Sequence, residues 1–355
     1  MSVAANGISQ VATIKKINVV DVHVGGDVHR IVLDGVKELP GSSVKEKMEY
    51  LRDHGDGLRH TLLEEPRGGH PSLFADLVVR PSDPKADAGF IIMELMGYPL
   101  ISGTNTMSTT IALLELGILQ MQEGANVVTL EAPGGLVEVD AHCVKGKVQS
   151  VTYEAQTPSY VQEKDLIVHL AGYGAVKFDL IWTGAYYPVV NVTELKLKLN
   201  ASDEAALVAF AREFIPAARK VYRPVHPEFG DQGPLSFVVF ACNPAPGPDG
   251  QLERRISCYE YPRSSVCRSP AGVPSTAAAA QLVDRGSLGL GDSLRTISPY
   301  DSTLSVTVTS VAPYGEYSGV KVRVTGSGWI IAKSELIVNF EDPLTPKTDL
   351  ASILE

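Results

Sequence analysis

Two segments far apart in the chain align with each other without a gap: SGTNTMSTTIALLELG from Ser102 and AGVPSTAAAAQLVDRG from Ala271. Each is rich in small and apolar residues and is closed by a glycine, Gly117 in the first and Gly286 in the second. This pattern is typical of a helix that ends in a left-handed C-terminal residue. A duplication over such a distance predicts a chain that folds as two related halves, each with one of these helices.

The segments around the two helices favour β-structure. FIIMELMGYPLI precedes the first helix and RRISCYEYPRSSVC the second, and VVTLEAPGGLVEVDAHCVKGKVQSVTYEA alternates around glycines as hairpins do. Further helices are predicted near residues 43–51 and 201–217, with Ser202 placed to cap the second. The predicted fold class is α+β, with two halves that each wrap a mostly antiparallel sheet around a central helix. A length of 355 residues fits two domains.

Composition excludes several classes of function. The formal net charge is -10 and the basic residues are dispersed, so nucleic acid is not expected as a partner. No apolar run reaches the roughly 20 residues of a membrane helix, and the N-terminus lacks a signal-peptide core, so we expect a cytoplasmic protein without a membrane partner. Four separated cysteines indicate neither disulfides nor zinc. His23 and His29 lack a third ligand, and we expect no metal site.

The two repeated helices suggest where a ligand binds. A helix N-terminus presents free N–H groups and a partial positive charge, which favour a carboxylate. If the halves pack about a pseudo-twofold axis, residues 102 and 271 approach opposite faces of one bound molecule. That arrangement suits proton transfer at the carbon next to the carboxylate. Simple capping also accounts for Ser102 and Thr104, because hydroxyl groups at these positions accept hydrogen bonds from the first turn.

Several motifs, in their order and spacing, resemble the proline racemase family. They are VDVHVGGDVHRIV, EEPRGGHPSLFADLVVRP, ADAGFIIMELMGYPLISG, FDLIWTGAYYPVVNV, CRSPAG and TGSGWIIAKSELIVNFEDPL, and they run along nearly the whole chain. The family includes hydroxyproline 2-epimerases and trans-3-hydroxyproline dehydratases. The resemblance implies two pseudo-symmetric domains of the diaminopimelate epimerase type, 1–165 plus 326–355 and 166–325, with an active-site cleft between them. It also implies a reaction without a cofactor, and a homodimer.

The chain departs from the family at the residues that matter most. The family uses two cysteines, one per half, as acid and base, and the matching positions here are Ser102 and Ala271. The family histidine after the first motif glycine is replaced by Thr104, and the aspartate that holds the substrate amine is replaced by Cys267. Alanine neither gives nor takes a proton, so a two-base racemase mechanism is excluded for this pair.

A one-sided reaction is therefore predicted: a dehydratase or double-bond isomerase that moves a proton from the Ser102 face of a small carboxylate or carbonyl substrate. A serine hydroxyl needs an activating neighbour. The Cys267 thiol, with a pKa lowered by the helix N-terminus, is one candidate, although a buried filler explains Cys267 as well. Without the aspartate, an amine would lack its counter-charge at Cys267. This favours a carboxylate, enone or lactam over a free amino acid.

Ser102 and Cys267 are thus the candidate catalytic residues. The candidate substrate-binding residues are Gly103, Thr104, Asn105, Ala271, Gly272, Val273, Asp231 and Tyr186. Two other hypotheses stay open: an inactive family member that acts as a binding protein, and a cyclase in which the shape of the cleft directs the reaction.

Overall fold

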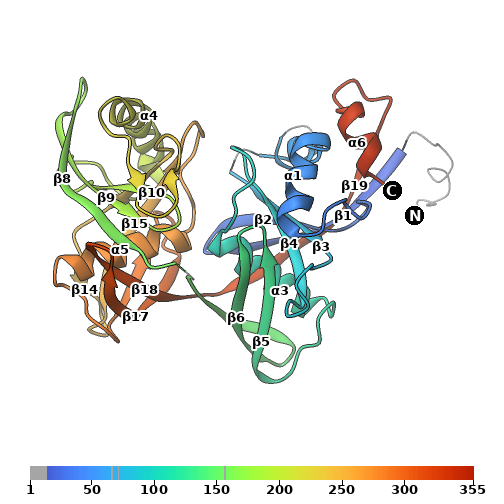
Figure 1. The fold of residues 1–355 in the computed structure, drawn as a ribbon, viewed down its shortest axis with the longest axis horizontal. Helices are drawn as coiled ribbons and strands as arrows, with labels where there is room; N and C mark the ends of the chain where they lie inside the picture. Colours follow the sequence, from blue (N-terminus) through green and yellow to red (C-terminus); the bar gives the residue numbers. More distant parts are fainter. Residues whose placement is uncertain (1–13, 65–66, 71, 156) are drawn as a thin grey trace.

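The computed structural model describes residues 14–355 except residues 65–66, 71 and 156. Figure 1 shows two lobes side by side, with the C-terminal segment returning to the lobe that begins the chain. Residues 1–13 of the first predicted domain, and three positions in the family-like segment EEPRGGHPS, lie outside the described residues.

Eight strands form the sheet of the first half. In pairing order they are β19 (Gly328–Asn339), β1 (Ile14–Val24), β2 (Asp27–Asp34), β3 (Phe74–Val79), β4 (Ala88–Met93), β5 (Gly124–Ala132), β6 (Gly135–Val144) and β7 (Lys147–Glu154). One apolar cluster joins this sheet to the central helix α3 (Gly103–Glu115). A second cluster joins it to α1 (Val44–His54), α2 (Gly57–Leu63) and α6 (Lys347–Ile353).

The second half repeats this plan. Its strands pair in the order β8 (Tyr160–Leu170), β9 (Gly174–Trp182), β10 (Tyr186–Asn191), β13 (Phe237–Ala241), β15 (Leu252–Glu260), β16 (Ser293–Ile297), β17 (Thr303–Tyr314) and β18 (Tyr317–Gly326). The central helix is α5 (Gly272–Asp284), and α4 (Glu204–Val221) packs in a separate apolar cluster. Short strands β11 (Val225–His226), β12 (Gly230–Asp231) and β14 (Ala245–Pro246) complete this half.

The two halves have the same pairing pattern from first strand to last. In each, the third and fourth strands pair in parallel, as do the fifth and sixth, and the other five pairings are antiparallel. Parallel neighbours need a crossover, and helices α3 and α5 supply the equivalent crossovers β4–β5 and β15–β16. The predicted α+β class with two pseudo-symmetric halves is therefore confirmed.

The repeated segments of the sequence form the two central helices, as predicted. Both end at a glycine with positive φ, 69° at Gly117 and 73° at Gly286, which the left-handed C-terminal position requires. Both helices are almost completely buried, and three of their threonines bond the carbonyl one turn back: Thr106 bonds Ser102 at 2.7 Å, Thr110 bonds Thr106 at 2.9 Å and Thr276 bonds Gly272 at 3.0 Å. Small polar side chains that bond their own backbone let a helix lie among strands on several sides.

Strands β7 and β18 join the two halves. They pair antiparallel, with Tyr153 opposite Val324, and the chain crosses between the halves after β7 and again between β18 and β19. The predicted domain boundary after residue 165 lies inside β8, and the one at residue 326 lies at the end of β18.

The predicted helix near residue 201 starts differently from the prediction. Residues Ala201–Asp203 form a 3-10 turn, and the side chain of Asn200 accepts from the Asp203 N–H at 2.9 Å, so the prediction of Ser202 as the cap was wrong. Among the residues that the structure describes, no helix combines the length and apolar character needed to cross a membrane.

Candidate active site

The N-termini of α3 and α5 meet at one buried tyrosine. A Cβ atom built on Gly103 would overlap the Tyr153 hydroxyl oxygen, and one built on Gly272 would overlap the same oxygen. That hydroxyl is buried and has no hydrogen-bond partner among the described residues. The first residues of both helices therefore contact a single phenol group, which places positions 102 and 271 beside one another at the junction of the halves.

Ser102 is the N-cap residue of α3 by position, but its hydroxyl does not cap the helix. Its backbone carbonyl accepts the Thr106 N–H at 3.1 Å, while its half-buried side chain remains outside the cap. Thr104 and Asn105 follow within the first turn, both buried. The capping explanation for Ser102 is thus wrong in this structure, and its hydroxyl remains available to a ligand.

Ala271 has a strained backbone at the N-terminus of α5. Its φ of 56° and ψ of 141° lie in a region that residues with a Cβ rarely adopt, and its N–H donates to Ser269 Oγ at 3.0 Å. Gly272 and Val273 continue the helix, Val273 half-buried. The strained position thus carries a side chain without a reactive group.

Relieving this strain is expected to stabilise the protein. Such a conformation costs about 1–3 kcal/mol for a residue with a Cβ. Replacing alanine by glycine removes that cost but lowers stability by about 0.4–1 kcal/mol, because glycine gives the unfolded chain more conformational freedom. We expect Ala271→Gly to raise the free energy of unfolding by about 1 kcal/mol, measured by denaturant titration. The exposed, helical Ala206 in α4 is the matched control, and Ala206→Gly should lower it by about 1 kcal/mol. An equal decrease in the free energy of unfolding in both variants would show that the backbone at Ala271 is not strained.

Cys267 lies just before α5, half-buried, and its thiol is not activated as the sequence suggested. A hydrogen bond with Cys258 and burial raise the pKa of Cys267 well above its ordinary value, and the nearby Asp27 charge adds to this. The prediction of a lowered pKa was wrong because Cys258, burial and the Asp27 charge outweigh the opposing charge of Arg263. Cys267 therefore stays a protonated thiol at neutral pH, which can donate a hydrogen bond but does not accept a proton.

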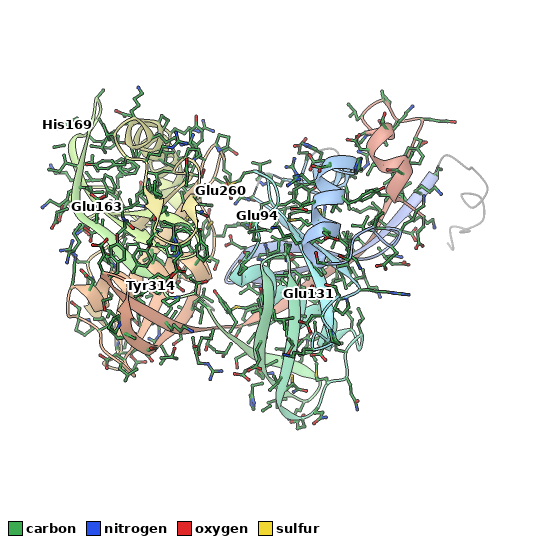
Figure 2. The ribbon with its side chains drawn as sticks, in the orientation of Figure 1. Glu94, Glu131, Glu163, His169, Glu260 and Tyr314 are labelled. Atoms are coloured by element: carbon green, nitrogen blue, oxygen red, sulfur yellow. The ribbon has the colours of Figure 1, made fainter. Side chains whose placement is uncertain are left out.

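A group of ionisable side chains that the sequence did not reveal fills the contact between the halves. We call Asp27, Glu94, Tyr187, Glu260 and Arg263 the interface cluster. All five are at most 7% exposed. Asp27 and Glu94 belong to the first half and the other three to the second, and Figure 2 shows Glu94 and Glu260 on facing sides of the two lobes.

Hydrogen bonds tie the interface cluster to both halves. Asp27 Oδ1 accepts the Arg268 N–H at 2.7 Å, and Arg263 Nη2 donates to the Leu73 carbonyl at 3.3 Å. Arg263 Nη1 also donates to Glu260 Oε2 at 3.1 Å. Burial raises the pKa of Asp27 to about 6, although bonds and charges from the 263–269 segment oppose the shift. Proton transfer near neutral pH is therefore within the range of this cluster.

The cluster also touches the first turn of α3. Asn105 Nδ2 donates to Glu94 Oε1 at 3.4 Å. Burial, together with the charges of Glu94 and Glu260, raises the pKa of Tyr187 well above its ordinary value, so this phenol stays protonated. Asn105 is thus the predicted binding residue that links the helix N-terminus to the buried carboxyl groups.

Two predicted binding residues lie elsewhere. Asp231 is exposed on β12 and pairs with Arg223 at 2.5 Å, and no contact brings it to either helix N-terminus in the described structure. Tyr186 packs against Trp182 in the apolar cluster of α4, with ring centroids 5.0 Å apart. Its neighbour Tyr187 points to the opposite face of β10 and joins the interface cluster, because side chains alternate along a strand. The prediction chose the wrong tyrosine of the pair.

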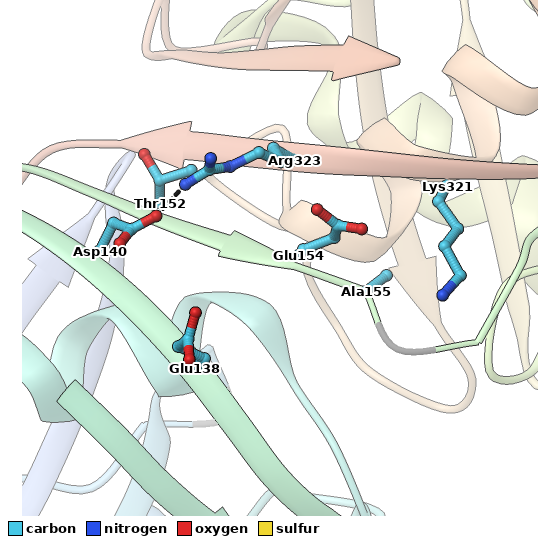
Figure 3. A pocket seen from close by; sticks show the side chains of 7 residues that line it. All are labelled: Glu138, Asp140, Thr152, Glu154, Ala155, Lys321 and Arg323. Atoms are coloured by element: carbon cyan, nitrogen blue, oxygen red, sulfur yellow. Dashed lines mark hydrogen bonds and ion pairs between the residues drawn. The ribbon is translucent and has the colours of Figure 1, made fainter. Parts of the chain in front are cut away.

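A surface cavity of about 280 Å³ lies away from this site, between β6, β7 and β18. Figure 3 shows its charged lining, in which Arg323 pairs with Asp140. Thr152 and Glu154 line the cavity, and Tyr153 between them points to the other face of β7. Within the described residues, no group of three or more histidine, cysteine, aspartate or glutamate side chains is arranged to hold a metal ion.

Comparisons with known proteins agree along almost the whole chain. The family model described as "Proline racemase" matches residues 19–346. A Marinobacter nauticus protein is 39% identical, covering 95% of each chain, and the proline racemase of Clostridioides difficile is 27% identical, covering 93% of this chain and 97% of the other. The crystal structure of a hydroxyproline epimerase from Agrobacterium vitis with bound trans-4-OH-L-proline superposes with a TM-score of 0.81. It is 31% identical, over 93% of this chain and 94% of the other.

Proposed function

The chain belongs to the proline racemase family, whose members include racemases and epimerases, and from this premise we propose a cofactor-independent lyase or isomerase that moves a proton on one face of its substrate. The substrate is a small carboxylate related to hydroxyproline. The observation that carries this proposal is the meeting of Gly103 and Gly272 at the Tyr153 hydroxyl, which brings two helix N-termini to one place. Their N–H groups and dipoles favour a carboxylate between them.

The side chains at the two N-termini support one-sided chemistry. Ser102 keeps a hydroxyl that the helix does not use, and Ala271 has nothing to exchange. Cys267, a protonated thiol beside α5, can donate a hydrogen bond to the substrate. The proton removed on the Ser102 face either returns to the substrate or leaves with a β-hydroxyl as water.

The buried Asp27 supports a substrate that carries an amine. Cys267 lacks a charge, but Asp27 lies close enough to affect its pKa and is buried with one oxygen, Oδ2, without a hydrogen-bond partner in the described residues. An ammonium group next to Cys267 would therefore find a carboxylate there. We include imino acids such as hydroxyproline among the substrates for this reason.

Hydrogen exchange tests the proposal. The protein is incubated in deuterated water with trans-4-hydroxy-L-proline, trans-3-hydroxy-L-proline and L-proline, and the α-position is followed by NMR and chiral chromatography. We expect exchange or dehydration of one substrate without formation of its epimer, and a loss of about a hundredfold in Ser102→Ala. Ser108→Ala, which removes a buried hydroxyl from the same helix, is the control and should keep the activity. Epimer formation would contradict one-sided chemistry, and binding without any reaction would favour the binding-protein alternative.

A further inference from the structure

The pseudo-twofold arrangement brings together one carboxyl group from each half. Strands β4 and β15 hold equivalent places, because each pairs antiparallel with the preceding sheet neighbour and parallel with the strand that follows the central helix. Glu94 directly follows β4, and Glu260 is the last residue of β15. The two glutamates therefore leave equivalent strands at the same edge and meet where the halves contact (Figure 2).

The two carboxyl groups are buried together. Glu94 is 7% exposed and Glu260 is 3% exposed, and the two carboxyl groups lie close enough for each to affect the pKa of the other. In the first half, Asn105 in the first turn of α3 bonds Glu94. In the second half, Arg263 bonds Glu260. The pair is thus fixed in position by one polar contact from each half.

The surroundings of the pair disfavour two negative charges. Burial and the charge of Glu260 raise the pKa of Glu94 well above its ordinary value, and burial also raises that of Glu260, against the opposing effect of Arg263. Asp76 on β3 is buried and faces Glu94, and Tyr187 on β10 faces both glutamates as a neutral phenol. Two carboxyl groups in such contact with one cation hold a single proton between them over a wide pH range.

We propose that Glu94 and Glu260 share one proton at neutral pH and that this pair, which Asn105 links to the first turn of α3, is the acid–base group that exchanges a proton with the substrate. This inference rests on the proposed function. The C–H bond beside the substrate carboxylate breaks, its electron pair stays on carbon as an enolate, and the proton moves to the ionised carboxylate of the pair. The pair then returns a proton, either to a substrate carbon or to a departing β-hydroxyl, which leaves as water. The atoms and charges balance without another reactant.

With the Glu94–Glu260 pair as the acid–base group, the Ser102 hydroxyl does not have to act as the base itself. The Ser102 hydroxyl has an ordinary alcohol's low basicity and needs a group that accepts its proton. The shared pair lies at the first turn of the same helix, through Asn105, and offers both a base and an acid. Ser102 then positions or relays the proton while the carboxyl pair holds it.

Two measurements test the proposal on the full-length protein. First, NMR of protein with 13C-labelled glutamate carboxyl groups follows the titration of the pair without substrate in the wild type, Glu94→Gln and Glu260→Gln. Second, the same variants are assayed for exchange of the α-hydrogen of trans-4-hydroxy-L-proline in deuterated water over pH. Glu131→Gln is the matched control, since Glu131 is a buried carboxyl group of the first half that bonds Ser82 and lies outside the interface cluster.

We expect two coupled titration steps in the wild type, and one independent step for the remaining glutamate in each Gln variant. Exchange should fall by about a hundredfold in Glu94→Gln and Glu260→Gln and little in Glu131→Gln. Because Gln mimics a protonated carboxyl group, both variants should fold, and thermal unfolding checks this.

Exchange that persists in both folded Gln variants would overturn the inference and leave the proposed function intact. Independent titration of the two glutamates in the wild type would also overturn the inference. A wild type that titrates in coupled steps but exchanges nothing would overturn the proposed function, and with it the catalytic role of the pair.

Discussion

Acidification from pH 6.5 to pH 3 is expected to cost the folded protein roughly 5 kcal/mol through His29 alone. Burial lowers the pKa of this fully buried side chain from 6.5 to about 3, and the nearby Asn105 side chain opposes only part of the effect. At about 1.4 kcal/mol for each factor of ten, the difference between 6.5 and about 3 gives this cost. The sign follows from proton binding: between these values the unfolded chain binds a proton that the folded protein does not.

Asp27 acts in the opposite direction over part of this range. Its pKa is raised from 3.8 to about 6, so the folded protein holds an extra proton between these values and gains stability as the pH falls through them. The His29 effect therefore has to be isolated by comparison of variants. His29→Phe keeps a ring beside Phe74, whose centroid lies 5.0 Å from that of His29, and removes the titration.

The measurement is the free energy of unfolding in urea at several pH values between 3 and 7. We expect the wild type to lose stability more steeply than His29→Phe as the pH falls below 6.5. The same substitution at the exposed His169 on β8 is the surface control. Parallel curves for the wild type and His29→Phe would show that His29 becomes protonated without cost in the folded protein.

Adding one methyl group at Gly103 is the second change with a large expected effect. The new Cβ would overlap the buried Tyr153 hydroxyl, which Gly272 contacts as well, so neither the tyrosine nor the helix has room to shift. Overpacking of this kind costs about 3 kcal/mol. We expect Gly103→Ala to lower the free energy of unfolding by that amount.

The control for this prediction is a glycine with ordinary space around it. A Cβ on Gly289 would lie 3.5 Å from the nearest atom, an oxygen of the Asp292 side chain, so Gly289→Ala should be nearly neutral. A Gly103→Ala protein as stable as the wild type would show that the two helix N-termini do not meet at Tyr153.

The halves and their central helices were predictable from sequence because the signals are local. The duplicated segments carry their own apolar pattern and their own terminal glycines, Gly117 and Gly286, and both helices begin and end where the alignment predicts. Ser102 and Ala271 could be located for the same reason. These features depend on residues that are close together in the chain.

The interface cluster could not be predicted in the same way. Glu260 and Arg263 are neighbours in one segment, but Glu94 joins them only because the two halves pack against each other. The choice between Tyr186 and Tyr187 depends on the register of β10, which a sequence does not fix by itself. The pKa of Cys267, which lies in the loop before α5, depends on its contact with Cys258 on β15.

The most direct test of the central claim is a crystal structure of the protein with trans-4-hydroxy-L-proline. We predict that its carboxylate lies between the N-termini of α3 and α5, with the α-hydrogen directed toward Ser102. A ligand bound elsewhere, for example in the cavity between β6, β7 and β18, with the two N-termini closed against each other, would contradict the claim.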